Sequence, residues 1–240
     1  MKNFLILFLF SILFNANVIA QRNYDSRTET NTHIYWQPDR VLTKEDFQGD
    51  GSSYEKSRLF CDSLDMCTMA FLGYFKILDI PKKEKDRGLL LEIAYFAPMF
   101  EKNTSYILDD KDPLGVAKQQ VIFDIYEVFA RMTRRKFKEL YKELGAEGHY
   151  GVLSIMFTTT TGDFEKKRKD IVGAYSREVY IEKKDSAYYQ WRELVDEGLS
   201  SLSEYATTIE DCERAIKGKP LDKRYITPEF IMGNLFEDED

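Results

Sequence analysis

The chain has 240 residues, a formal net charge of −7 and an apolar fraction of 43%. This acidic balance argues against a nucleic-acid partner, because proteins that bind the phosphate backbone present a cationic surface to it. The length is sufficient for one domain with a sizeable hydrophobic core.

The first 20 residues have the pattern of a secretory signal peptide. Lys2 precedes an apolar run from Phe4 to Phe14, and Ala20 stands directly before Gln21. The run is too short for a permanent transmembrane helix. We therefore expect cleavage after Ala20 and an exported protein, periplasmic or extracellular, with no integral membrane segment after cleavage.

The remaining chain divides by composition into three parts. Residues 21–32 are polar and predict a flexible leader, whereas residues 231–240 are strongly acidic and predict a solvated tail. Between them, residues 33–230 are expected to form a single α+β domain.

Three cysteines form an odd set for a protein exported to an oxidising compartment. If Cys61 and Cys67 lay on one extended strand, they would be about 20 Å apart, too far for a disulfide unless a turn intervened. Structural or unpaired thiols are therefore the expectation for these two residues and Cys212.

Strand-forming residues dominate the first half of the chain. Residues 34–36 predict a short strand, and residues 65–80 and 89–98 predict two longer ones. The charged insert at residues 81–88 separates the longer runs, which predicts a hairpin with a solvated connection.

Helix formers dominate the second half. Asp112 and Pro113 predict the start of one helix that continues to Leu144, about 45 to 50 Å long. Residues 151–161 fit a strand or a helix, while residues 163–180 and 186–217 each predict a further helix. The order of elements predicts an α+β fold with a small antiparallel sheet followed by long helices.

Three groups of residues match the signature of one protein family. The first group is Trp36, Arg40, Leu42, Thr43, Asp46, Phe47 and Gly49, with Lys44 in place of a second tryptophan. The second is Phe123, Asp124, Ile125, Glu127, Ala130, Arg131 and Arg134, and the third is Tyr175 and Trp191. Over most of residues 34–191 the chain resembles the family of exported bacterial domains of unknown function 922, predicted HExxH zinc-dependent proteases. That resemblance implies a zincin-like scaffold.

The resemblance places the family's chemistry on residues that cannot perform it. A protease of this kind binds zinc through two histidines one helical turn apart and uses the intervening glutamate as general base. These positions fall on Lys118, Gln119 and Ile122, and the histidine taken as third ligand falls on Ile181. A lysine ammonium has no lone pair, isoleucine has no donor atom and glutamine is not a base. The motif is therefore degenerate, and no metal ligand is assigned.

The two histidines of the chain do not repair this site. His33 and His149 fall on none of the ligand positions, and three histidine ligands cannot be drawn from two residues. No cofactor is therefore expected, and zinc would be expected only if the register of the resemblance is misread.

The motif residues that the chain keeps are expected to serve as scaffold: Asp124, Glu127, Arg131, Tyr175 and Trp191. Glu127 and Arg131 have the spacing of an ion pair along a helix, worth a few tenths of a kcal/mol if exposed. Asp124 and Glu127 lie about 200° and 140° around the helix from Ile122, so neither shares the former ligand face. Ile122, with Ile125 and Phe129, predicts that this face has become apolar packing.

These observations predict an exported, catalytically inactive metalloprotease-like protein that acts as a binding or assembly module in the cell envelope. Its partner is expected to be a protein or a peptide. The alternative is an active hydrolase with a rebuilt, non-HExxH site, which a lysine such as Lys118 or clustered carboxylates in a deep pocket would favour. A pocket filled by Ile122 and Ile181 would count against that alternative.

Overall fold

The computed structural model describes residues 25–144 and 149–229. The predicted signal peptide at residues 1–20 and the predicted acidic tail at residues 231–240 lie outside this range. Within it, no helix combines the length and the apolar character that crossing a bilayer requires.

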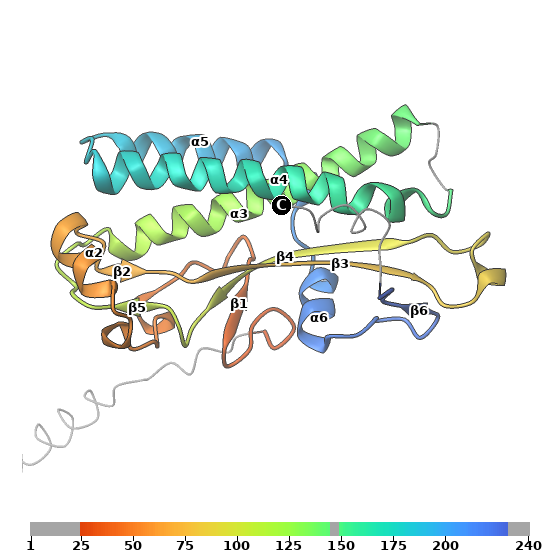
Figure 1. Ribbon diagram of the computed structural model, residues 1–240, viewed down its shortest axis with the longest axis horizontal. Helices are drawn as coiled ribbons and strands as arrows, with labels where there is room; N and C mark the ends of the chain where they lie inside the picture. The colour runs from red at the N-terminus through yellow and green to blue at the C-terminus, as the bar shows by residue number, and fades with distance from the viewer. Residues whose placement is uncertain (1–24, 145–148, 230–240) are drawn as a thin grey trace, which may run out of the picture.

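An antiparallel sheet forms one layer of the molecule (Figure 1). Its strands, in spatial order, are β1 (His33–Tyr35), β4 (Ile93–Glu101), β3 (Leu72–Pro81) and β6 (Tyr225–Ile226). The β3–β4 hairpin is its centre, with Leu72 opposite Phe100 and Asp79 opposite Ile93, which confirms the predicted hairpin. A second, two-stranded sheet pairs β2 (Thr68–Met69) with β5 (Tyr106–Ile107).

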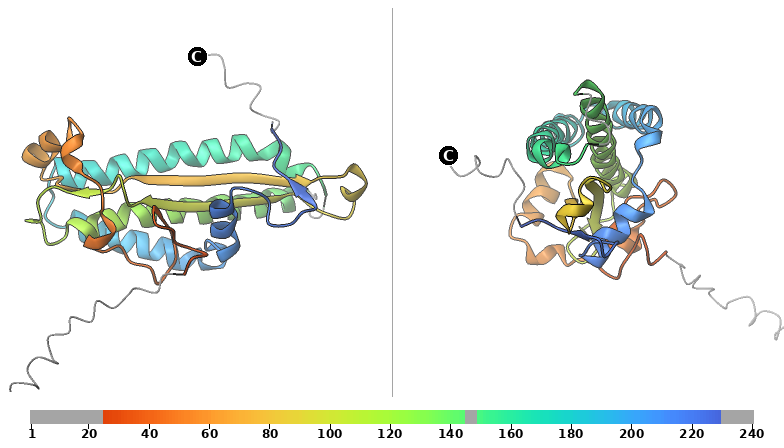
Figure 2. Two further views of the ribbon diagram at one scale, coloured as in Figure 1. Left: turned by 90° about the horizontal axis from the view of Figure 1, so that it is seen from below. Right: turned by 90° about the vertical axis from the view of Figure 1, so that its right-hand side faces the viewer.

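Long helices cover one face of the four-stranded sheet, and a short helix lies on the other (Figures 1 and 2). The helices are α2 (Ser57–Leu64), α3 (Gly115–Glu143), α4 (Val152–Ser176), the π-helix η4 (Arg177–Ile181), α5 (Ala187–Ser201) and α6 (Ile209–Lys217). Helices α3, α4 and α5 form the covering layer, whereas α6 packs on the opposite side against β4. The predicted α+β class is confirmed, as is the long helix after Asp112.

The segment that sequence patterns left open, residues 151–161, is the start of α4. The buried carboxylate of Glu92 accepts hydrogen bonds from the backbone nitrogens of Gly151 and Leu153 at 3.0 Å and of Ser154 at 3.2 Å. These amide groups have no partner within a helix, and negative charge is favoured there. A residue about 60 positions earlier thus caps the start of this helix and stabilises it.

The prediction of a single helix over residues 186–217 is wrong. Helix α5 ends at Ser201, and a short 3-10 helix, η5 (Ser203–Tyr205), follows. Helix α6 begins only after Thr208, whose side chain accepts from the Asp211 backbone nitrogen at 3.1 Å in a capping box. The break occurs because residues 205–208 run back along α3, where they hydrogen-bond to its side chains.

The predicted flexible leader over residues 21–32 is too long. The side chain of Glu29 is only 6% exposed and forms ion pairs with Arg40 at 2.8 Å and Lys102 at 2.6 Å. Tyr35 also donates a backbone hydrogen bond to Thr28. The described part of the leader therefore packs beside β1 instead of remaining free.

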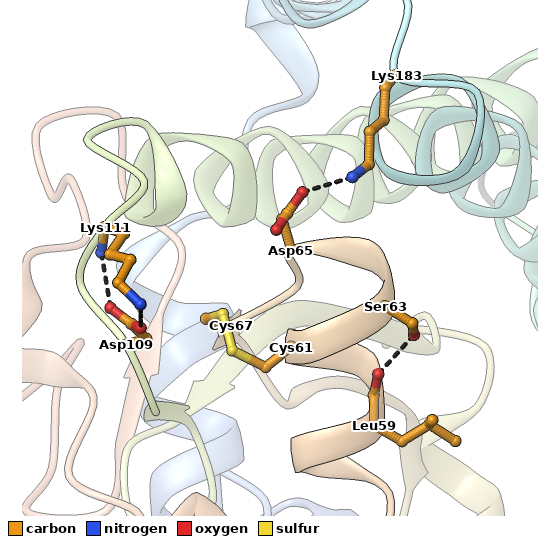
Figure 3. Close-up of a disulfide and its surroundings, with 8 residues drawn as sticks. All are labelled: Leu59, Cys61, Ser63, Asp65, Cys67, Asp109, Lys111 and Lys183. Carbon is orange, nitrogen blue, oxygen red and sulfur yellow. Dashed lines mark hydrogen bonds and ion pairs between the residues drawn. A yellow bond between two sulfur atoms is a disulfide. The ribbon is translucent and has the colours of Figure 1, made fainter.

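Cys61 and Cys67 form a disulfide with a Cα–Cα distance of 4.3 Å (Figure 3). The two cysteines do not lie on one extended strand, the case considered from the sequence. Cys61 lies in α2, and Asp65 ends that helix with a φ of 58°. This left-handed residue reverses the chain and returns Cys67 to Cys61. Cys212, by contrast, is a buried free thiol in α6.

Thiol labelling followed by mass spectrometry tests this arrangement. We expect no labelling of the folded protein, one labelled cysteine after unfolding without reductant, and three after unfolding with reductant. The reason is that Cys212 is fully buried while the other two are bonded. Three labelled cysteines without reductant would contradict the disulfide.

Candidate functional site

Gln119, the position of the general base in the resemblance, holds two other elements together. Its side chain is 1% exposed on α3. The amide oxygen accepts from the Ala70 backbone nitrogen at 2.9 Å, and the amide nitrogen donates to the Tyr180 hydroxyl at 2.8 Å. The amide thus joins the end of β2 to η4.

Lys118, the first ligand position, is held by an ion pair. Its ammonium lies 2.6 Å from Asp112, and it is also 5.6 Å from the centre of the Tyr180 ring. Its backbone oxygen accepts from the Tyr175 hydroxyl at 2.8 Å. The cation is therefore neutralised by a carboxylate at the start of α3.

Ile122, the second ligand position, packs into an apolar cluster with Ile125 and Phe129. This packing agrees with the predicted apolar conversion of that face. Ile181, the third position, is 60% exposed. The π-helix supplies the reason, because its wider turn directs Val179 and Tyr180 into the core and leaves Ile181 outside. A pocket filled by Ile181 is therefore ruled out.

A cavity of about 230 Å³ lies next to Lys118 and Tyr180, which line it in part. Asp65 and Lys183 form an ion pair of 2.5 Å at this cavity (Figure 3). Burial raises the pKa of Tyr180 and also that of Tyr175. Both phenols are therefore neutral hydrogen-bonding groups at physiological pH and not activated bases.

Five polar side chains form a continuous stripe along another face of α3, which we call the polar seam: Gln120, Asp124, Glu127, Arg131 and Arg134. Their spacings alternate between four and three residues, so they lie on one side of the helix. Most of them are buried, because the N-terminal segment and the chain after α5 cover the stripe. Buried polar groups of this kind require partners.

The first half of the polar seam binds the N-terminal segment and α5. Asp124 accepts from the Trp36 indole nitrogen at 2.7 Å and from Arg192 of α5 at 2.5 Å. Gln120 donates to Asp124 at 2.8 Å and accepts from the Leu42 backbone nitrogen at 2.8 Å. Trp36 and Leu42 belong to the first motif group, so this group is positioned by α3.

The second half binds the chain between α5 and α6. Glu127, fully buried, accepts from Arg131 at 2.7 Å, from the Thr207 hydroxyl at 2.6 Å and from the Thr207 backbone nitrogen at 2.9 Å. Burial raises the pKa of Glu127, so its charged form depends on these donors. Arg134 donates to backbone oxygens of Tyr205 and Phe96 and pairs with Asp211 at 3.0 Å.

The other matching residues have structural partners too. Arg40 forms ion pairs with Glu29 at 2.8 Å and Asp46 at 2.6 Å. Tyr175 meets Trp191 edge to face at 5.7 Å, and the Trp191 indole donates to Glu178 at 2.8 Å. The predicted scaffold residues thus take part in ordinary packing and hydrogen bonding.

A groove of about 730 Å³ lies beside the polar seam, between α3, α5 and the segment after β1. Its apolar lining includes Trp36, Leu42 and Val116, and its charged lining includes Lys44 and Arg192. Among the described residues, no three His, Cys, Asp or Glu side chains come together as a metal site would require.

No family model, curated protein or solved structure matches the chain in comparisons with known proteins. The resemblance to the zinc-protease family therefore rests on its motif residues alone.

Sequence reasoning missed Tyr180, Thr207 and Arg192, which complete the contacts of the predicted positions. The spacing of the polar seam could have indicated a buried polar face. By contrast, no local pattern links Thr207 to Glu127, 80 residues earlier.

Glutamate-to-alanine substitutions on α3 test the importance of the polar seam. We expect Glu127→Ala to lower the free energy of unfolding by about 3 to 5 kcal/mol, because it leaves the buried Arg131 without its counter-ion. The matched control is Glu139→Ala, which breaks the exposed Arg135–Glu139 pair of equal spacing and should cost less than about 0.5 kcal/mol. Urea unfolding measures both, and equal losses would contradict the buried role.

Proposed function

We propose that the protein is a non-catalytic module on a zincin-like scaffold, exported to the cell envelope, where it binds or assembles with a protein or peptide. The observation that carries this proposal is the engagement of Gln119. Both ends of its side-chain amide are occupied by Ala70 and Tyr180. A residue at the general-base position is thus committed to structure.

The neighbouring positions support the same proposal through their chemistry. Lys118 is paired with Asp112, Ile122 belongs to the core, and Ile181 is exposed. None of these side chains supplies a neutral donor to a metal ion. The alternative, a hydrolase with a rebuilt site, is less well supported, because the only lysine of the old motif is ion-paired and Tyr180 is a neutral phenol.

The groove beside the polar seam is the surface on which we place partner binding. Its volume of about 730 Å³ exceeds that of the two cavities lined by Lys118, at about 230 Å³ and about 580 Å³. Val41 at its edge is 61% exposed and supplies apolar surface next to charged groups, whereas Trp36 and Leu42 in its wall are buried. An apolar surface with a few polar groups suits a peptide segment.

Two measurements, metal content and peptidase activity, test the proposal that the protein is not a zinc protease. Protein purified without a chelator or affinity tag should contain far less than one zinc per chain by elemental analysis. It should also fail to cleave a mixed peptide library, because the ligand and base positions carry no suitable groups.

Re-analysis after incubation with zinc and dialysis serves as the control for metal lost in purification. Stoichiometric zinc combined with chelator-sensitive cleavage would overturn the proposal.

A further inference from the structure

The connection between β3 and β4 projects at the end of the molecule opposite α2 (Figures 1 and 2). It includes the short 3-10 helix η3 (Glu84–Asp86). Asp86 donates its backbone hydrogen bond to Lys83 at 2.9 Å, and Leu90 donates to Asp86 at 2.8 Å. These bonds give the backbone of the tip a defined turn structure.

The tip presents bare apolar surface. Leu89 is 86% exposed, the highest value for a large hydrophobic side chain among the described residues, and Leu91 is 41% exposed. With Leu90 they form a run of three leucines on the return path of the hairpin. Several exposed leucines at a projecting point indicate a surface that is covered in use.

The same connection carries exposed cations. Lys82, Lys83 and Lys85 are exposed, and residues 81–91 hold four basic and two acidic side chains, a local charge of +2 in a chain of −7. The Lys82 backbone nitrogen also donates to the Arg224 backbone oxygen at 2.7 Å, which places residues 222–224 beside the tip, where the Arg224 side chain is paired with Asp222. The positive charge is thus concentrated where the apolar side chains are bare.

We propose that this tip, residues 82–91, docks the protein on an anionic lipid bilayer. Leu89 and Leu91 would enter the headgroup region, while the lysines contact lipid phosphates and keep their charged ends in water. The acidic remainder of the chain favours an orientation with only this end against the membrane. The combination of an apolar point and a basic surround favours a bilayer over a protein partner. The proposal is independent of the state of the former zinc site.

Vesicle co-sedimentation with the full mature chain tests the proposal. Binding to phosphatidylcholine vesicles containing phosphatidylglycerol should be about tenfold or more tighter than binding to phosphatidylcholine alone, and it should weaken with salt. Two variants should each lose most of this binding: Leu89→Ser/Leu91→Ser, and Lys82→Glu/Lys83→Glu/Lys85→Glu.

Matched controls change the same residue types away from the tip. Leu194→Ser alters a leucine of α5 that is 57% exposed, and Lys166→Glu/Lys167→Glu/Lys169→Glu reverses three exposed lysines of α4. Both controls should bind vesicles within about twofold of the unaltered chain, with folding checked by circular dichroism. The proposal would be overturned if the protein bound neither kind of vesicle or bound both kinds equally. Equal losses of binding in the tip variants and the control variants would also overturn it.

Discussion

The arrangement of the helices depends on the hydrogen bonds and the ion pair that the buried carboxylate of Glu127 forms. This carboxylate joins Arg131 on its own helix to Thr207, which lies between α5 and α6. A charge without solvent contact is stable only with such partners, and removing one leaves the others uncompensated. Arg134 and Asp124 extend the same constraint to α6, α5 and the segment after β1. Helix α3 is therefore the element against which the rest of the chain is positioned.

The residues of α3 that hold the fold are distinct from the positions that the resemblance assigns to zinc chemistry. Around the helix, Asp124 and Glu127 of the polar seam lie about 200° and 140° from Ile122, and Glu127 lies about 80° from Gln119. Gln119 fits its surroundings, because its amide satisfies both the Ala70 nitrogen and the Tyr180 hydroxyl. The proposed absence of zinc chemistry is therefore compatible with an intact polar seam.

Local sequence patterns predicted the elements whose structure is determined mainly by their own residues. The β3–β4 hairpin follows from its strand-forming composition and α3 from its helical periodicity, although α3 begins at Gly115, just after the predicted Asp112–Pro113 start. These patterns did not predict elements that depend on distant residues. Glu92 caps α4 from another part of the chain, and the helix predicted over residues 186–217 is interrupted at residues 202–208, where Thr207 hydrogen-bonds to Glu127. The buried state of the Glu127–Arg131 pair and the exposure of Ile181 also depend on tertiary packing. Spacing alone places a residue on a helix face but does not say what covers that face.

The most direct test of the claim that the general-base position is structural is the stability of Gln119→Leu, which preserves volume but removes both hydrogen bonds. The account predicts that its free energy of unfolding in urea falls by about 1 to 3 kcal/mol, since the Ala70 nitrogen and the Tyr180 hydroxyl lose their partner. It also predicts that hydrogen exchange at the Ala70 amide becomes faster. Unchanged stability and exchange, together with loss of a measurable hydrolytic activity, would contradict the account and assign Gln119 a chemical role.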